Sequence, residues 1–238
     1  MRVRLPLGRS LFFAAAFAFA LMALLPLRLA IGWFGLEGRG LAAREASGSI
    51  WLGTLKEAQF GPVPLGDVEA RLGTLPLFLG RARLALARRD EGGNFEGAVT
   101  VSRHSFGIDD ASGQMRVGGL FAPLPLASLD LDDVSARFSG GLCEAAGGQV
   151  RAALSGEIAG LLLPGGLSGN ARCDGGALLL PLAGQSGMER LDLRLYASGR
   201  YRIDLIVRPS DDAARDRLVA AGFALTRAGY ARRIDGSF

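Results

Sequence analysis

The sequence has little of what metal-binding and catalytic proteins use most often. Its 238 residues contain one histidine, His104, and two cysteines, Cys143 and Cys173, which lie 30 positions apart. A zinc site needs three or four clustered Cys, His or carboxylate ligands at short spacings. This sequence has no such spacing, so we expect no metal site and no bound cofactor.

Catalytic motifs are also missing. Ser186 stands in Gln-Ser-Gly and fails the G-x-S-x-G pattern of a nucleophile elbow. Residues 38–43 fit G-x-G-x-x-A, but an apolar segment precedes them where a dinucleotide-binding fold needs a strand. His104 has Ser102, Ser105 and Asp109 nearby, and we interpret it as a surface histidine. We therefore expect no enzyme active site.

Three acidic pairs could act as paired catalytic carboxylates. We interpret them instead as markers of turns, a strand edge and a helix start, where short acidic side chains are common. The pairs are Asp109-Asp110, Asp132-Asp133 and Asp211-Asp212.

The excess of positive charge is confined to the first 45 residues. The whole chain carries 27 basic and 23 acidic residues, and the residues up to Glu45 hold six of the former and two of the latter. The remainder is therefore neutral. A nucleic-acid-binding domain needs a basic face, because neutralising phosphates supplies most of its affinity. We expect no nucleic-acid partner.

One long apolar run is present, from Leu11 to Leu27, and arginines 2, 4 and 9 precede it. Its length is near the lower limit for crossing a bilayer. The positive-inside rule keeps such an N-terminus in the cytoplasm, and Trp33 and Phe34 then fall at the far interface. A signal peptide cleaved after Ala18-Phe19-Ala20 and a buried core helix are the alternatives.

These features predict two regions. Residues 1–34 form a cytoplasmic stub and a single transmembrane anchor in the inner membrane, and residues 35–238 form one periplasmic domain. In an oxidising compartment two cysteines favour a disulfide, so we expect Cys143 to pair with Cys173. Two free buried cysteines are the alternative.

The residue pattern of the periplasmic region predicts antiparallel β-structure. The 35 glycines of the whole chain disfavour long helices, and short segments of this region alternate apolar and polar residues between turn residues. The clearest are 129–138 (with one slip in the alternation), 149–154, 191–195 and 201–205. One short helix is predicted near Asp211–Ala221, capped by Ser210 and ended by Gly222.

A faint repeat with an offset of 65 to 66 residues suggests two or three degenerate units in this domain. Residues 46–48, Gly53 and residues 68–71 are echoed by residues 111–113, Gly118 and residues 134–137. A looser third unit would start at Ser168-Gly169.

Several segments, taken in order, resemble the type II secretion system protein N family. They are Ala46-Ser-Gly-Ser-Ile-Trp-Leu-Gly-Thr-Leu55, Leu65–Arg71, Leu75-Pro-Leu-Phe-Leu-Gly80, Leu142–Val150 and the tail from Gly222 to Gly236. The family motif lies at Gly48, Trp51 and Gly53. The family pattern has a Trp at the position aligned with Leu72.

The resemblance implies an accessory component of the machine that exports folded proteins across the outer membrane. The expected partners are its inner-membrane components, and the family brings no catalytic residues. The family is also similar to envelope proteins with long curved sheets that handle lipid, so a β-groove protein that binds or transfers lipid is the alternative. Within the motif, Gly48 and Gly53 permit bulges or close backbone approach, and we expect Trp51 to be a core residue.

Overall fold

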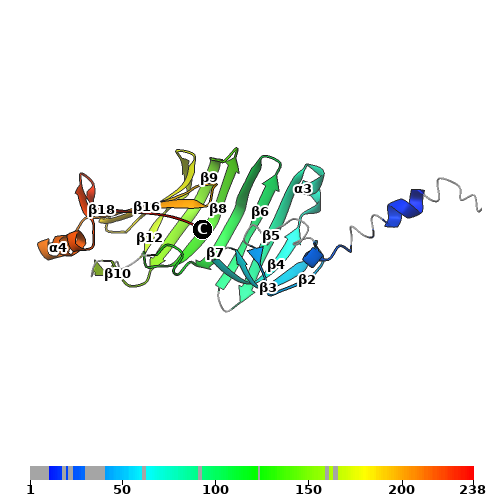
Figure 1. Ribbon diagram of the computed structural model, residues 1–238, viewed down its shortest axis with the longest axis horizontal. Coiled ribbons are helices and arrows are strands. Elements are labelled where there is room, and N and C mark those ends of the chain that lie inside the picture. Colours follow the sequence, from blue (N-terminus) through cyan, green and yellow to red (C-terminus); the bar gives the residue numbers. More distant parts are fainter. Residues whose placement is uncertain are drawn as a thin grey trace, which may run out of the picture.

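The domain is built on one long antiparallel sheet (Figure 1). This computed structural model describes residues 11–17, 20, 24–29, 41–60, 63–90, 93–122, 124–158, 161–162 and 166–238. Sixteen strands form the main sheet in the order β1-β3-β4-β5-β6-β7-β8-β9-β12-β14-β15-β16-β18-β17, with β2 on β3 and β13 on β14. Strands β10 (Glu157–Ile158) and β11 (Leu161–Leu162) pair separately.

Most strands pair with their neighbours in the chain. The first half contains β1 (Leu41–Ala42), β2 (Glu45–Gly48), β3 (Gly53–Phe60), β4 (Val63–Leu72), β5 (Arg81–Asp90), β6 (Gly93–Ser102), β7 (Ser105–Arg116) and β8 (Leu126–Ser139). The second half contains β9 (Leu142–Leu154), β12 (Leu167–Asn170), β13 (Arg172–Asp174), β14 (Ala177–Ala183), β15 (Glu189–Leu195), β16 (Arg200–Val207), β17 (Ala224–Thr226) and β18 (Gly229–Ser237).

The alternating segments of the sequence all lie in strands, so the mainly antiparallel β prediction is confirmed. Residues 129–138 lie in β8, 149–154 in β9, 191–195 in β15 and 201–205 in β16. Strand β16 shows the physical basis, since Tyr201, Ile203, Leu205 and Val207 are buried and the residues between them are not.

Bulges bend the strands near their middles. The pairing register shifts in β3, β7 and β8 beside Glu57, Asp110 and Asp133, and these are non-glycine residues with positive φ. Each of their amides donates to a side chain of a neighbouring strand, namely Asp67 Oδ1, Ser135 Oγ and Ser112 Oγ respectively. The slip in the alternation of β8 is this bulge, which adds a residue and increases local twist.

The acidic pairs 109–110 and 132–133 therefore lie at bulges inside strands β7 and β8, not in turns or at a sheet edge. A short acidic side chain suits such a position, because Asp tolerates the left-handed backbone better than most residues.

The main core lies in the C-terminal half of the sheet. Residues of β8, β9, β14, β15 and β16 pack there with Phe121 of the β7–β8 connection and Leu218. The Phe121 and Tyr201 rings meet edge-to-face with centroids 5.2 Å apart. A second, smaller cluster holds Leu27, Leu55, Ala58 and Val68 at the N-terminal end.

The segments of the proposed repeat lie in different strand arrangements. Residues 46–48 and 68–71 lie in β2 and β4, on either side of β3. Residues 111–113 and 134–137 lie in β7 and β8, which pair directly.

Two helices of the described part of the chain accompany the sheet. The C-terminal one, α4 (Asp212–Ala220), matches the predicted helix, but Asp211 caps it through Oδ1, which accepts from the Ala214 amide at 2.6 Å. The prediction of Ser210 as the cap was wrong by one residue, because an Asp at the next position competes for the same role. A five-residue helix, α3 (Thr74–Phe78), joins β4 to β5 and was not predicted.

The N-terminal region is described only in part. Residues 11–17 are helical and exposed. No helix among the described residues is long and apolar enough to cross a membrane. Residues 18–19 and 21–23 of the apolar run, and Trp33 and Phe34 of the predicted interfacial belt, lie outside the described residues.

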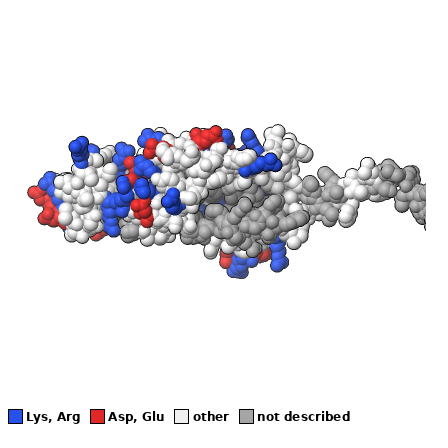
Figure 2. Space-filling model, turned by 45° about the horizontal axis from the view of Figure 1, so that its top comes forward, with Lys and Arg blue, Asp and Glu red and all other residues white. Residues whose placement is uncertain are grey.

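Charged groups of both signs alternate over the surface of the domain (Figure 2). This mixed surface agrees with the neutral charge of the region after residue 45.

Candidate functional site

The loop from Gly48 to Gly53, here called the motif loop, connects β2 to β3. The Ser49 amide donates to Leu52 O at 3.0 Å, and the Leu52 amide donates to Ser49 Oγ at 3.2 Å. Gly48 has φ +83°, and a Cβ there would lie 2.4 Å from Leu52 O. Only glycine fits this position, so the first glycine of the motif closes the loop.

The motif loop holds the chain that precedes the sheet. The Ile50 amide donates to Leu25 O at 3.0 Å, and Pro26 forms an isolated antiparallel bridge with Ser49. Leu27 is 7% exposed and packs on Leu55, Ala58 and Val68. Residues at the end of the apolar run therefore contact the sheet.

Gly53 allows Leu27 to approach the sheet closely. A Cβ at Gly53 would lie 2.5 Å from Leu27 Cδ2 and 3.0 Å from Ser49 O. The second glycine of the motif thus leaves the space that Leu27 fills, which is the close approach that glycine permits in a strand.

Trp51 differs from the expectation. It is partly exposed and belongs to neither apolar cluster, so its placement in the core was wrong. The reason is local, because Trp51 lies in the motif loop, two residues before β3 begins at Gly53. Its neighbour Leu52 is 65% exposed.

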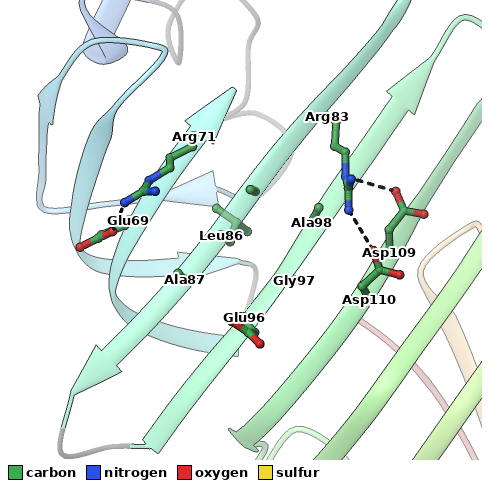
Figure 3. A pocket seen from close by; sticks show the side chains of 11 residues that line it. Glu69, Arg71, Arg83, Leu86, Ala87, Glu96, Gly97, Ala98, Asp109 and Asp110 are labelled. Carbon is green, nitrogen blue, oxygen red and sulfur yellow. Dashed lines mark hydrogen bonds and ion pairs between the residues drawn. The ribbon is translucent and has the colours of Figure 1, made fainter. Parts of the chain in front are cut away.

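A charged hollow of about 370 Å³ lies on one face of strands β4 to β7 (Figure 3). Arg83 Nη2 donates to Asp110 Oδ2 at 3.0 Å, and its Nε lies 3.9 Å from Asp109 Oδ2. Arg71 pairs with Glu69 at 3.1 Å on the same strand. With Glu96, the hollow carries four carboxylates and two guanidinium groups, a formal charge of −2.

The ion pairs of the hollow lie at the surface. They are exposed, with the Arg71 and Glu69 side chains 63% and 55% accessible, so they add little stability. Such groups are free to exchange partners at an interface. A negative balance also disfavours phosphate ligands.

The two cysteines are joined in the structure. Cys143 of β9 and Cys173 of β13 form a disulfide with Cα atoms 5.5 Å apart. Strand β13 pairs with β14, and β9 pairs with β8 and β12, so the disulfide links strands that do not pair directly. The Cys143 amide also donates to Gly176 O at 2.8 Å.

The remaining candidate residues do not come together as a site. His104 is exposed in the β6–β7 turn, while the hydroxyls of Ser102 and Ser105 bond each other at 2.7 Å. Asp109 Oδ2 accepts from Thr100 Oγ1. Among the described residues, no three His, Cys, Asp or Glu side chains cluster as metal ligands would.

The sequence profile described as "Type II secretion system (T2SS), protein N" matches residues 39–231. This match spans well over half of the 238 residues. The chain belongs to the type II secretion system protein N family. No curated protein and no solved structure matches the chain. The matched stretch includes the motif loop, the charged hollow and the disulfide, so the predicted family resemblance is confirmed.

One structural residue of the sheet was missed by sequence reasoning. Arg88 of β5 is 8% exposed, and its guanidinium donates to three backbone carbonyls, each at 3.1 Å. These carbonyls belong to Leu65 of β4, Gly93 of β6 and Gln114 of β7, so one side chain joins four strands. The signal was its position two residues after Leu86, which places it on the apolar face of β5.

Proposed function

We propose that this protein is an accessory component of the type II secretion system, held in the inner membrane with its sheet domain in the periplasm. Membership in the family is the observation that carries the proposal. The domain contributes binding surfaces to assembly or function of the machine, and it carries out no reaction of its own.

The two edges of the sheet differ in how they could serve a partner. At one edge, β1 and β2 both pair with β3 and cover it. At the other, β17 pairs only with residues 229–231 of β18. The described strands leave residues 232–237 of β18 as an open edge, and such edges accept a strand from another protein.

Two ion pairs link this open edge to β16. Asp235 of β18 accepts from Arg202 Nε at 2.7 Å, and Arg233 Nε donates to Asp204 at 2.7 Å. The hydrogen bond and charge of Asp235 raise the pKa of the Arg202 guanidinium, so this group stays protonated. The edge therefore offers a partner an ordered strand and mixed charge.

The charged hollow supplies a second surface, complementary to a partner segment that is polar and partly basic. Its four carboxylates and two guanidinium groups suit a protein surface better than a lipid chain. This composition is why we place the lipid-carrier alternative second.

The test is co-purification of the full chain from membranes, together with secretion by a deletion strain. Photo-crosslinking residues at Ser237, on the open edge, and at Glu96, in the hollow, should capture inner-membrane secretion components. The same residue at Gln185, an exposed turn position, serves as the control.

A charge reversal separates the hollow from the rest of the surface. Glu96→Arg should weaken co-purification, whereas Glu144→Arg, an exposed glutamate on β9, should leave it unchanged. Normal secretion with no co-purifying secretion component would contradict the proposal. Phospholipid bound to the purified protein in that case would favour the lipid-carrier alternative.

A further inference from the structure

The β4–β5 connection is an uncharged, apolar tip. Residues 72–80, Leu-Gly-Thr-Leu-Pro-Leu-Phe-Leu-Gly, contain no charged side chain. Helix α3 within them has no buried residue, and Leu75, Phe78 and Leu79 are 79%, 88% and 79% exposed. Three large apolar side chains exposed together in one short segment indicate a contact surface and not a chance arrangement.

This apolar tip lies beside the end of the apolar N-terminal run. The Leu72 amide donates to Ile50 O at 3.3 Å, and the Ile50 amide donates to Leu25 O at 3.0 Å. Neighbouring strands lie about 5 Å apart, so Leu72 lies within roughly 10 Å of Leu25. Figure 1 shows α3 at the end of the sheet that the N-terminal chain enters.

More apolar side chains are exposed in the segments that these bonds connect. Leu52 of the motif loop is 65% exposed, and Leu24 and Leu29 are 76% and 59% exposed. The motif loop, the apolar tip and the residues around the end of the apolar run therefore present leucine and phenylalanine side chains at one end of the molecule.

We propose that the apolar tip inserts into the surface of the phospholipid bilayer that holds the N-terminal segment. This inference rests on the proposed membrane anchoring. The occupant is lipid because the tip adjoins residues that emerge from the apolar run, and because its flanks suit anionic headgroups. Arg81 and Arg71, which also pairs with Glu69, stand just outside the uncharged stretch, and no acidic residue lies within it.

Insertion would give the domain a second attachment. A single segment leaves a domain free to tilt, whereas a second apolar contact fixes one end of the sheet on the bilayer. Helix α3 suits this role, because its side chains support no part of the core and are free to enter lipid.

The experiment uses the full chain with Thr74→Cys, labelled with an environment-sensitive fluorophore. Thr74 is exposed and begins α3, so the three apolar side chains are unchanged. The native cysteines are paired and do not react without a reductant. The matched control is Leu225→Cys, an exposed site on β17 at the opposite end of the sheet order.

Both labelled chains are reconstituted into phosphatidylethanolamine–phosphatidylglycerol vesicles that carry quenchers on their acyl chains. An interfacial helix lies about 5–10 Å into the headgroup boundary, so quenching at position 74 should exceed that at position 225 at least about twofold. Adding Leu75→Ser, Phe78→Ser and Leu79→Ser to the Thr74 variant should remove the difference without preventing flotation with the vesicles.

Each other outcome has a separate meaning. A chain that floats with the vesicles but shows equal quenching at both positions overturns the insertion and leaves the proposed function intact. A chain that does not float overturns membrane anchoring as well. Shielding of position 74 only after secretion components are added would assign the tip to a protein partner and overturn the lipid contact.

Discussion

Replacing Gly53 by alanine should loosen the contact between the motif loop and the chain before the sheet. The new Cβ would lie 2.5 Å from Leu27 Cδ2, with Ser49 O and Ser47 O at 3.0 and 3.1 Å. The two carbonyl oxygens belong to backbone and restrict any shift of the Cβ. Leu27 must therefore move out of the space that it shares with Leu55, Ala58 and Val68.

The expected magnitude follows from the burial of Leu27. A fully buried leucine is stabilised by about 1.5–3 kcal/mol relative to an exposed one, and Leu27 is 7% exposed. Loss of most of that burial should raise the equilibrium constant for local opening by about 10- to 150-fold. Hydrogen exchange of the Ile50 amide, which donates to Leu25 O, measures this opening in the full chain in detergent.

A double-mutant cycle tests the cause. Leu27→Ala alone should cost about 2–5 kcal/mol, but it also removes the side chain with which the new Cβ collides. Gly53→Ala should therefore add less than about 0.5 kcal/mol in the Leu27→Ala background. Gly118→Ala is the control, because its Cβ meets nothing within 4 Å. Additive effects of the two substitutions would refute the steric argument.

Three further predictions concern the sheet domain. Replacing both cysteines (Cys143→Ala with Cys173→Ala) should lower the free energy of unfolding by about 3.5 kcal/mol, which is the loop-entropy value for a 30-residue loop. This loss should lower Tm by roughly 7–14 °C. A decrease in Tm below about 3 °C in thermal unfolding would contradict the prediction. Gly148→Ala should lower the free energy of unfolding, measured with denaturant, by at least about 2 kcal/mol. The reason is that residue 148 has φ +98° and its new Cβ would lie 2.3 Å from Asp133 O. Gly147→Ala is the control and should change this free energy little, because its Cβ would have no atom within 4 Å. Asp211→Ala should cost about 1 kcal/mol through loss of the helix cap, and an equal loss for Ser210→Ala would show that the cap is assigned to the wrong residue.

The strands could be predicted because their burial pattern is regular. On β16 and most of β8, apolar and polar residues alternate, and each alternation is visible in the sequence alone. The order of the strands also follows simply, since successive strands mostly pair with each other. Helix α4 was visible for a similar reason, because its start has two aspartates and its end has Gly222.

The candidate site was harder to predict from the sequence than the strands were. The charged hollow joins residues from β4, β5, β6 and β7, and the bulge at Asp110 sets their register. One extra residue in a strand moves every later side chain to the other face, so the grouping cannot be read from composition. The contact of Leu27 with Gly53 is similarly hidden, because an apolar run shows no sign of which of its residues packs on a sheet.

The asymmetry of the two sheet edges bears on where a partner could bind. The edge at β3 is covered by β1 and β2 and lies beside the chain that leads to the N-terminal segment. The open edge at β18 lies eleven strand steps away in the sheet order. At about 4.8 Å per step, the path along the sheet is roughly 50 Å, and twist shortens the direct distance. If one end of the sheet rests on the bilayer, a strand that pairs with β18 comes from a partner that reaches well beyond the membrane surface. Among inner-membrane secretion components, those with periplasmic segments of that reach are therefore the ones that crosslinking from Ser237 should capture.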